Sequence, residues 1–300
     1  MGSPCTLLFF DENQHKATYL IDACLHELQR LEQKYSRYLP DSFLSKINAA
    51  GRNSIEIDEE TAALLNYANT AYDESEGLFD ITSGLFRSIW NFKEKKIPDH
   101  RHIQEILKKV GWEKVYWENN FLQFSLEGME IDLGGIVKEH AADLLFKLFA
   151  QSEVTSGLID LGGDIKIIGP HPDGKPWGIG VTDPTNSTQA RITLQLKHGA
   201  ITTSGQYQRS FLHKGRRYGH LINPKTGWPV TGLISATVWS ESCLIAGSLT
   251  SIAILKGYPD GKKWLDELQV SYVLINDKNE LFESIGLKKA EKIGPVELSR

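Results

Sequence analysis

The spacing of apolar residues changes along this chain of 300 residues, and the change limits the folds that it can adopt. In the first half, residues 16–35, 58–75 and 99–111 carry apolar side chains three and four positions apart, which predicts amphipathic helices. From residue 157 onward, short apolar runs separated by turn residues predict strands, with one further helix at 244–257. Helices grouped early and strands grouped late are typical of an α+β fold rather than of regular β-α alternation.

We expect one domain over residues 1–300, with a helix-rich first half to about residue 130 and a strand-rich second half from about residue 131. The predicted fold class is α+β, with antiparallel or mixed sheets and flanking helices. A hairpin is predicted at 114–125 and a helix at 137–151, where the sequence reads VKEHAADLLFKLFAQ.

Composition narrows the classes of function. The net charge is −5 and the isoelectric point is near 6.0, which argues against nucleic-acid binding, because such proteins carry a basic footprint. The cysteines Cys5, Cys24 and Cys243 have no metal-ligand spacing, and their odd number does not suggest a disulfide framework. No apolar run approaches the roughly 18 residues of a membrane span. The start of the sequence has no signal-peptide pattern, so we expect a cytoplasmic protein or an exported one whose leader has been removed.

Several turns rich in glycine and small polar residues are candidate binding loops. In IDLGGIVKEH, Asp132 is followed by Gly134-Gly135 and then by a predicted helix, so the backbone can approach a ligand closely and aim free N–H groups at it. Each turn alone also fits an ordinary hairpin or helix cap. Together they predict loops that converge on one extended ligand that carries phosphate. The other turns are at Asp80, at Gly162-Gly163-Asp164, at Thr203-Ser204-Gly205 and directly after His220.

His220 is the candidate general base. It follows a glycine and precedes a Pro-Lys-Thr-Gly turn, and imidazole is the side chain that most readily exchanges a proton near neutral pH. The chain has nine histidines, so a structural role for His220 is the alternative.

Taken together, these segments resemble the FAD:protein FMN transferase family (ApbE-type, formerly called thiamine-biosynthesis lipoproteins). The resemblance runs from Met1 to about Gly257 in the family's order, and although each motif is loose, seven in order are specific. The matching segments are Met1-Gly2-Ser3, SRYLPDSFLSKIN, GLFDITSGLFRSIWNF, IDLGGIVKEHAAD, LIDLGGDIKIIG, ITTSGQYQRSF and HLINPKTGWPV.

The resemblance implies an ApbE-like fold with one wide cleft for FAD and a metal-assisted transferase activity. Enzymes of this family cleave the pyrophosphate of FAD, usually with Mg²⁺, attach FMN to a Thr or Ser of an acceptor flavoprotein of a redox system, and release AMP. Attack of a hydroxyl on a pyrophosphate phosphorus requires charge neutralisation, in-line positioning and a base. Mg²⁺ prefers oxygen ligands and keeps contacts to phosphates.

The resemblance also assigns site residues by position. His220 would be the base, and the Gly135 carbonyl and the Ser251 hydroxyl would be metal ligands. Thr203 and Ser204 would line the phosphate region. The remaining FAD contacts would be made by Met1, Tyr38, Leu78, Phe79, Asp80, Asp132, Lys138 and Ile222.

Three segments depart from the family pattern: the metal segment, a segment near the flavin and the segment after His220. The family's A-D-A-x-x-T segment is here AGSLTS, so Gly247 replaces the metal-ligating Asp and Ser251 replaces the Thr. Lys138-Glu139-His140 replaces the usual Lys-Gly-Tyr, and Asn223 replaces the usual Asp after His220.

These departures leave alternatives open. The enzyme could use a rearranged metal site, with Asp132, Asp164 or the FAD phosphates supplying charge. The chain could instead be a divergent paralogue that binds FAD or another nucleotide without transferring FMN, or an interaction subunit of a redox assembly. If the missing carboxylate limits the protein, we expect Gly247→Asp to raise its affinity for Mg²⁺.

Overall fold

The computed structural model describes residues 3–118, 120–207 and 209–284. Backbone contacts divide the chain into two compact units. The sheet unit comprises residues 1–30, 137–207 and 232–300, and the helix unit comprises residues 31–136 and 208–231. The single domain predicted over residues 1–300 stays a prediction.

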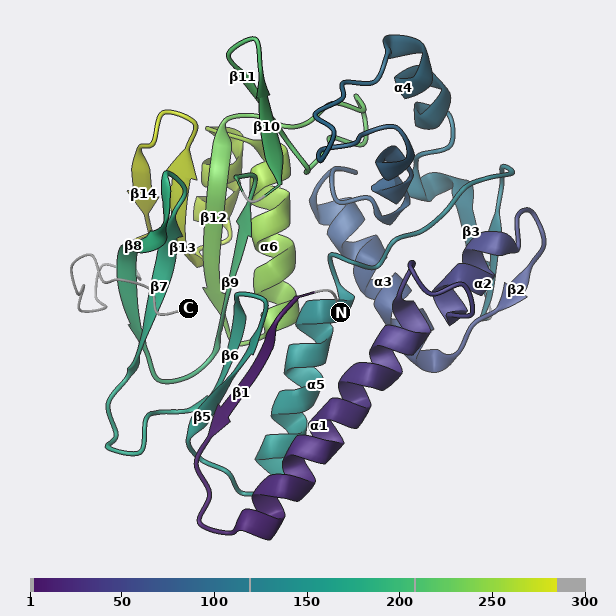
Figure 1. Cartoon of the computed structure of the whole chain (residues 1–300). Helices are drawn as coiled ribbons and strands as arrows, with labels where there is room; N and C mark the ends of the chain where they lie inside the picture. Colours follow the sequence, from purple (N-terminus) through teal and green to yellow (C-terminus); the bar gives the residue numbers. More distant parts are fainter. Residues whose placement is uncertain (1–2, 119, 208, 285–300) are drawn as a thin grey trace. The chain divides into compact units, whose positions relative to one another are not determined.

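The sheet unit is built on an antiparallel sheet, which Figure 1 shows with its strands labelled. In the described part of the chain, seven strands form it in the order β1-β5-β6-β9-β12-β13-β14. Their bounds are β1 (Cys5–Phe9), β5 (Gly157–Leu161), β6 (Asp164–Gly169), β9 (Ala200–Gly205), β12 (Leu233–Ser240), β13 (Ser271–Asn276) and β14 (Leu281–Glu283). The turn between β5 and β6 needs glycine, because Gly162 and Gly163 have φ angles of 69° and 93°.

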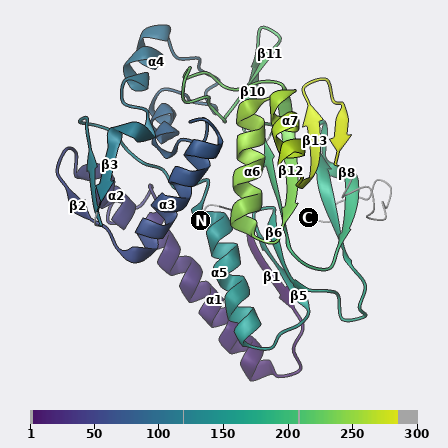
Figure 2. The ribbon, with the colours of Figure 1, turned by 180° about the vertical axis from the view of Figure 1, so that it is seen from behind.

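Helices and a hairpin cover the two faces of this sheet. Helix α5 (Val137–Gln151) packs against β5 and β6, and α6 (Cys243–Lys256) packs against β9 and β12. Figure 2 shows α7 (Asp260–Glu267) beside α6. The hairpin of β7 (Trp177–Asp183) and β8 (Asn186–Leu196) packs Ile179 and Leu194 against Ile167 and Ile201. Since neighbouring residues of a strand point to opposite faces, Ile167 and the α5-facing Lys166 separate the two layers.

The helix unit combines helices with two small sheets. Helix α1 (Gln14–Tyr35) begins in the sheet unit, and its residues from Leu31 onward belong to the helix unit. An aromatic and aliphatic core that includes Phe86, Trp90, Ile103 and Tyr218 packs the unit together. The other elements are α2 (Phe43–Ala49), β2 (Ile55–Glu56), α3 (Glu59–Glu74), η1 (Ile81–Ser88), α4 (His100–Leu107), η2 (Trp112–Lys114), β3 (Val115–Glu118), β4 (Phe121–Phe124), β10 (Ser210–His213) and β11 (Arg216–Gly219).

The predicted α+β class and the predicted helices are confirmed, with ends shifted by a few residues. Helix α3 begins after Asp58, whose side chain accepts a hydrogen bond from the Thr61 N–H at 2.9 Å. The turn predicted at Thr203-Ser204-Gly205 is wrong. These residues end strand β9 and pair with β12, because small polar residues also fit a pleated strand that lies beneath a helix.

The Asp143 carboxylate joins α5 to the beginning of α6. It accepts hydrogen bonds from Ser242 Oγ at 2.7 Å, from the Cys243 N–H at 2.9 Å and from the Leu244 N–H at 3.0 Å. The first N–H groups of a helix have no partner within the helix, and its N-terminus favours negative charge. Asp143 therefore satisfies these donors and fixes where α5 meets α6.

Asp143→Ala should lower the free energy of unfolding by about 2 kcal/mol, because it leaves partly buried N–H groups without their acceptor. Urea denaturation of the two proteins measures the difference. Glu267→Ala, at an exposed position of α7 in the same unit, is the matched control and should change stability by less than about 0.5 kcal/mol. Equal losses for both variants would contradict the anchoring role of Asp143.

Candidate functional site

The predicted site residues divide between the two units. Met1 lies outside the described residues. Lys138, Thr203, Ser204 and Ser251 belong to the sheet unit, and Tyr38, Leu78, Phe79, Asp80, Asp132, Gly135, His220 and Ile222 belong to the helix unit.

In the sheet unit, hydroxyl groups from β9 and α6 meet. Ser204 Oγ lies 2.8 Å from Thr250 Oγ1 and 3.2 Å from Ser251 Oγ. Thr250 Oγ1 also donates to the Gly247 carbonyl at 2.8 Å. Thr203 Oγ1 lies 2.8 Å from Thr237 Oγ1 on β12. The structure thus brings together Ser204 and Ser251, which the sequence placed 47 residues apart.

Two buried carboxylates and one ammonium group lie beside these hydroxyls. Lys138 pairs with Asp164, and its Nζ is 3.8 Å from Glu139 Oε1. Asp164 Oδ1 accepts from the Thr203 N–H at 3.3 Å, which connects the pair to β9. The Lys138 ammonium was predicted to contact FAD, and this stays a prediction; in the structure it holds Asp164.

The electrostatics of this group follow from burial. Glu139 is 7% exposed and Asp164 is 3% exposed. Burial raises the pKa of Glu139 to about 7, against the lowering effect of Lys138 and with a further rise from Asp164. Burial alone would lower the pKa of Lys138, but Asp164 and Glu139 outweigh it and the pKa is raised. Lys138 therefore stays charged, while Glu139 has a carboxylate that its surroundings stabilise poorly.

Glu139 occupies the space above Gly247. A Cβ atom at position 247 would lie 2.5 Å from Glu139 Cγ and 3.2 Å from Glu139 Oε1. Glycine inside a helix costs about 1 kcal/mol relative to alanine, and this close approach explains why it stands in α6. The sequence showed both departures from the family pattern, but their proximity depends on how α5 packs against α6. The Gly247→Asp variant expected to raise Mg²⁺ affinity would therefore require Glu139 to move.

In the helix unit, the segment Asp132-Leu133-Gly134-Gly135 is a turn held by its own aspartate. Asp132 Oδ1 accepts from the Gly134 N–H at 3.0 Å, and the Ile136 N–H donates to the Leu133 carbonyl at 3.0 Å. Arg37 pairs with the same carboxylate. Sequence reasoning missed Arg37, whose neighbour Tyr38 was the residue singled out.

The turn itself does not require a glycine at position 135. Its φ is not in the left-handed region, and among the described residues the nearest atom to an added Cβ would be Phe79 Cζ at 3.6 Å, an ordinary contact. Gly84, by contrast, is needed, since its Cβ would lie 2.6 Å from Asp132 Cβ. An exposed glycine without a need inside its own unit fits a backbone that a ligand approaches. The predicted metal contact of the Gly135 carbonyl stays a prediction.

Tyr38 presents an exposed ring in a cationic setting. Tyr38 is 75% exposed, and its hydroxyl oxygen accepts a hydrogen bond from Arg37 Nη2 at 2.8 Å. Arg37 lowers the pKa of Tyr38, with smaller contributions from Arg209 and Arg87 and with burial opposing them. An aromatic face beside guanidinium groups suits a flavin or a nucleotide.

Asp80 is a buried helix cap. The sequence placed it in a loop, and the structure places it directly before η1. One of its oxygens accepts from the Thr82 N–H at 2.8 Å and from Thr82 Oγ1 at 2.6 Å, and the other accepts from the Trp112 N–H at 3.1 Å. Burial raises the pKa of Asp80, although these hydrogen bonds oppose the rise. The two preceding residues are held by the turn after α3, since the Leu78 N–H donates to the Ser75 carbonyl at 3.3 Å and the Phe79 N–H donates to Ser75 Oγ at 2.7 Å. The FAD contacts of all three stay predictions.

His220 directly follows β11, and its surroundings keep the imidazole neutral near pH 7. Burial lowers its pKa to about 4, and the positive charge of Arg209 adds to the effect. His220 Nδ1 is buried and has no hydrogen-bond partner among the residues described. Ile222, two positions on, pairs with Pro229 and packs against the core that contains Trp90. Sequence alone could not show that the His220 imidazole has an unused nitrogen.

The sheet unit contains oxygen atoms of the kinds that coordinate Mg²⁺ in proteins. Within the described ranges, no group of three His, Cys, Asp or Glu side chains could hold a metal ion. Mg²⁺ however is usually held by one or two carboxylates together with phosphates and waters. Glu139 and Asp164 supply carboxylates, and the Gly247 carbonyl and the Ser251 hydroxyl are further oxygen donors on α6. These residues therefore fit the metal that the family resemblance implies.

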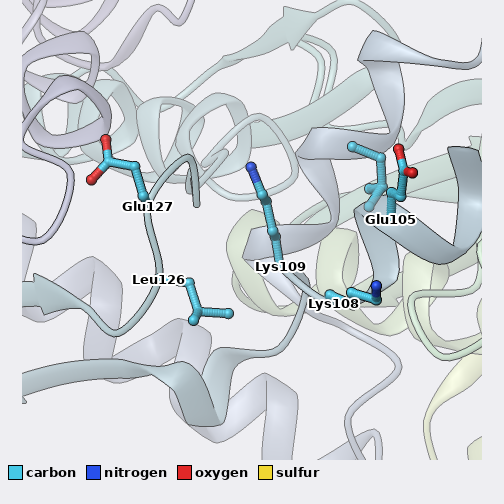
Figure 3. Close-up of a pocket in the computed structure, with 6 residues that line it drawn as sticks. Glu105, Lys108, Lys109, Leu126 and Glu127 are labelled. Carbon is cyan, nitrogen blue, oxygen red and sulfur yellow. The ribbon is translucent and has the colours of Figure 1, made fainter.

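A pocket of about 500 Å³ in the helix unit shares no residue with the predicted site. Figure 3 shows its lining side chains, which come from the end of α4 and from the segment after β4. They are Glu105, Ile106, Lys108, Lys109, Leu126 and Glu127.

The helices were also compared with the requirements of a membrane span. Within the described residues, none of them combines the length and the apolar character needed to span a bilayer.

Comparison with known proteins shows relatives over most of the chain. A protein of Chlamydia pneumoniae named FAD:protein FMN transferase is 28% identical over 86% of this chain and 82% of its own length. A protein of the same name from Treponema pallidum is 30% identical over 77% of this chain and 69% of its own length.

Solved structures agree with these relatives. The crystal structure of an ApbE protein from Thermotoga maritima superposes with a TM-score of 0.87 at 29% identity, covering 96% of this chain and 95% of that one. The flavin transferase ApbE from Vibrio cholerae gives a TM-score of 0.87 at 23% identity over 97% and 96% of the two chains, and shows the same fold. The ApbE family model matches residues 1–274. With this match and these relatives, the chain belongs to the ApbE family.

Proposed function

We propose that this protein transfers FMN from FAD to a Thr or Ser hydroxyl of an acceptor flavoprotein and releases AMP. The relatives named FAD:protein FMN transferase support the reaction. The observation that carries it to this chain is the group of oxygen donors on α5, β6, β9 and α6, where Glu139, Asp164, Ser204 and Ser251 gather. Such a group suits a metal-bridged pyrophosphate better than an apolar ligand.

The reaction sets the tasks of these residues. The acceptor oxygen forms a bond to the FMN phosphorus, the bond from that phosphorus to the bridging oxygen breaks, AMP leaves, and the acceptor proton passes to a base. Mg²⁺, when bound, would neutralise the charge on the pyrophosphate oxygens. Glu139, Asp164 and Ser251 would hold it, and the Lys138 ammonium pairs with Asp164 and orients it.

His220 would accept the proton. Its low pKa leaves the imidazole neutral near pH 7, and its buried Nδ1 has no hydrogen-bond partner among the described residues. Anionic phosphates close to an imidazole raise its pKa, so bound FAD would move His220 toward the range in which a general base works well. The acceptor we propose is a flavoprotein of a redox system.

The presence of Gly247 in place of the family's metal-ligating aspartate favours a second candidate function. If the missing aspartate has abolished the metal site, the chain binds FAD or another nucleotide without cleaving it. The two functions differ in whether FAD stays intact.

Incubation of the protein with FAD, Mg²⁺ and an acceptor that carries the family's target Thr should release AMP and add one FMN to the acceptor. Chromatography of the nucleotides and mass spectrometry of the acceptor measure both products, and a sample with EDTA is the control. FAD that binds but stays intact would overturn the proposed transfer and support the second function.

His220→Asn should lower kcat by about 100-fold or more, because it removes the base but keeps a polar side chain of similar size. The Kd for FAD, measured by fluorescence quenching, should change by less than about threefold. His102→Asn, at an exposed position of α4, is the matched control. Unchanged turnover in His220→Asn would remove His220 from the mechanism.

The same histidine should make stability depend on pH. Its folded-state pKa of about 4 lies below the ordinary 6.5, so the unfolded chain binds the proton more tightly. The stability contributed by the neutral imidazole is full above about pH 6.5 and is lost as the pH falls toward 4, by up to about 3 kcal/mol. Urea denaturation between about pH 7.5 and about pH 4.5 should show a steeper decline for the wild type than for His220→Asn. Parallel curves would contradict the low pKa.

A further inference from the structure

Two departures from the family pattern meet in the sheet unit. Position 139 on α5 carries glutamate where the family has glycine, and position 247 on α6 carries glycine where the family has a metal-ligating aspartate. The Cγ of Glu139 would be 2.5 Å from a Cβ at position 247, so the glutamate occupies the place of the side chain that α6 has lost. Relative to the family pattern, the carboxylate side chain is on α5 instead of α6, and the glycine is on α6 instead of α5.

One oxygen of the Glu139 carboxyl group has no partner in the described part of the chain, and the group's side-chain hydrogen bond with Asp164 raises the pKa of Glu139 rather than stabilising the negative charge. The Glu139 side chain is more than nine-tenths buried. Its Oε2 atom is buried as well and has no hydrogen-bond partner among the described residues. Its Oε1 is 3.8 Å from Lys138 Nζ, which is beyond hydrogen-bond distance, and the same ammonium pairs with Asp164. A buried carboxylate in this situation is unfavourable unless something else binds it.

The charges of this group also point to a cation. In the described part of the sheet unit, two carboxylates, Glu139 and Asp164, share the one ammonium group of Lys138. The next oxygen donors are the Gly247 carbonyl and, one helical turn further along α6, the hydroxyl of Ser251. Carboxylate, carbonyl and hydroxyl oxygens are ligands that Mg²⁺ and Mn²⁺ accept.

We propose that Glu139 supplies, from α5, the metal carboxylate that the family takes from the α6 position occupied here by Gly247. The ligand is a divalent cation of the Mg²⁺ class, and the substitutions at 139 and 247 form one exchange. This inference rests on the proposed function, because a metal-assisted transfer gives the site its purpose. Glu139 extends one methylene further than an aspartate, and the absence of a side chain at Gly247 gives it room.

The test uses Mn²⁺ as a paramagnetic probe, titrated into the full chain with and without FAD and followed by electron paramagnetic resonance. Glu139→Gln keeps the shape of the side chain and removes its charge, so we expect the Kd for Mn²⁺ to rise at least tenfold. Glu267→Gln, at an exposed position of α7, should leave the Kd unchanged. Circular dichroism and urea denaturation show that each variant is folded.

A reciprocal exchange tests the pairing of the two positions. Glu139→Gly alone removes the carboxylate and should weaken Mn²⁺ binding at least tenfold, whereas Gly247→Asp alone crowds Glu139 and should not strengthen binding. The double variant, Glu139→Gly with Gly247→Asp, should return the Kd to within about threefold of the wild type, a strongly non-additive result.

The outcomes separate this inference from the proposed function. Wild-type Mn²⁺ binding that Glu139→Gln leaves unchanged overturns the inference, whether or not FMN is transferred. A wild type that binds no Mn²⁺ with or without FAD also overturns it. Binding that depends on Glu139 in a protein that never releases AMP supports the inference and overturns the proposed transfer.

Discussion

The contact between the Asp143 carboxylate and the first turn of α6 sets the register on which the chemistry of the sheet unit depends. Asp143 and Glu139 are four residues apart on α5, and Cys243 and Gly247 are four residues apart on α6, so each pair lies on one helix face. Once Asp143 holds the Cys243 N–H at 2.9 Å, the preceding turn of α5 lies opposite the following turn of α6. The meeting of Glu139 and Gly247 follows from this anchor.

Burial has a large effect on the protonation of the groups near the contact between α5 and α6. The pKa of the Cys243 thiol is raised well above its usual value by burial, and the carboxylates of Asp164, Asp143 and Glu139 raise it further. Cys243 therefore remains a neutral thiol and does not compete as a soft metal ligand. The same lack of solvent strengthens every charge interaction among Lys138, Asp164 and Glu139. Under the proposal, the site would favour hard cations over soft ones, because its ligand atoms are oxygens.

Local pattern predicted much of this protein, and long-range packing explains what it missed. Residues 137–151 and 244–257 showed apolar spacing that was sufficient to find α5 and α6, and Asp58 was identified as a cap from its own neighbours. The segment at Thr203 was misassigned because its small polar residues suit both a turn and a strand under a helix. The hairpin of β10 and β11 was missed because it has little apolar alternation.

The candidate site divides in the same way. Motif order singled out Ser204, Ser251 and His220, since these residue types and spacings are visible in the sequence, and their site roles stay predictions. The buried, unpartnered oxygen of Glu139 was not visible, because it arises from two segments that are 108 residues apart in the chain and are brought together only by helix packing. The pairing of Arg37 with Asp132 is a second example, because nothing in either local sequence specifies the other.

The close approach at Gly247 also has a consequence for how such a chain could have arisen. If an ancestor carried glycine at 139 and aspartate at 247, two orders of substitution were available. Acquiring Glu139 first would have crowded two acidic side chains into the space of one, and losing the aspartate first would have left the site without that carboxylate. Each intermediate carries a defect that the second substitution removes. Residues 139 and 247 should therefore be inherited as a unit, and each constrains what selection tolerates at the other.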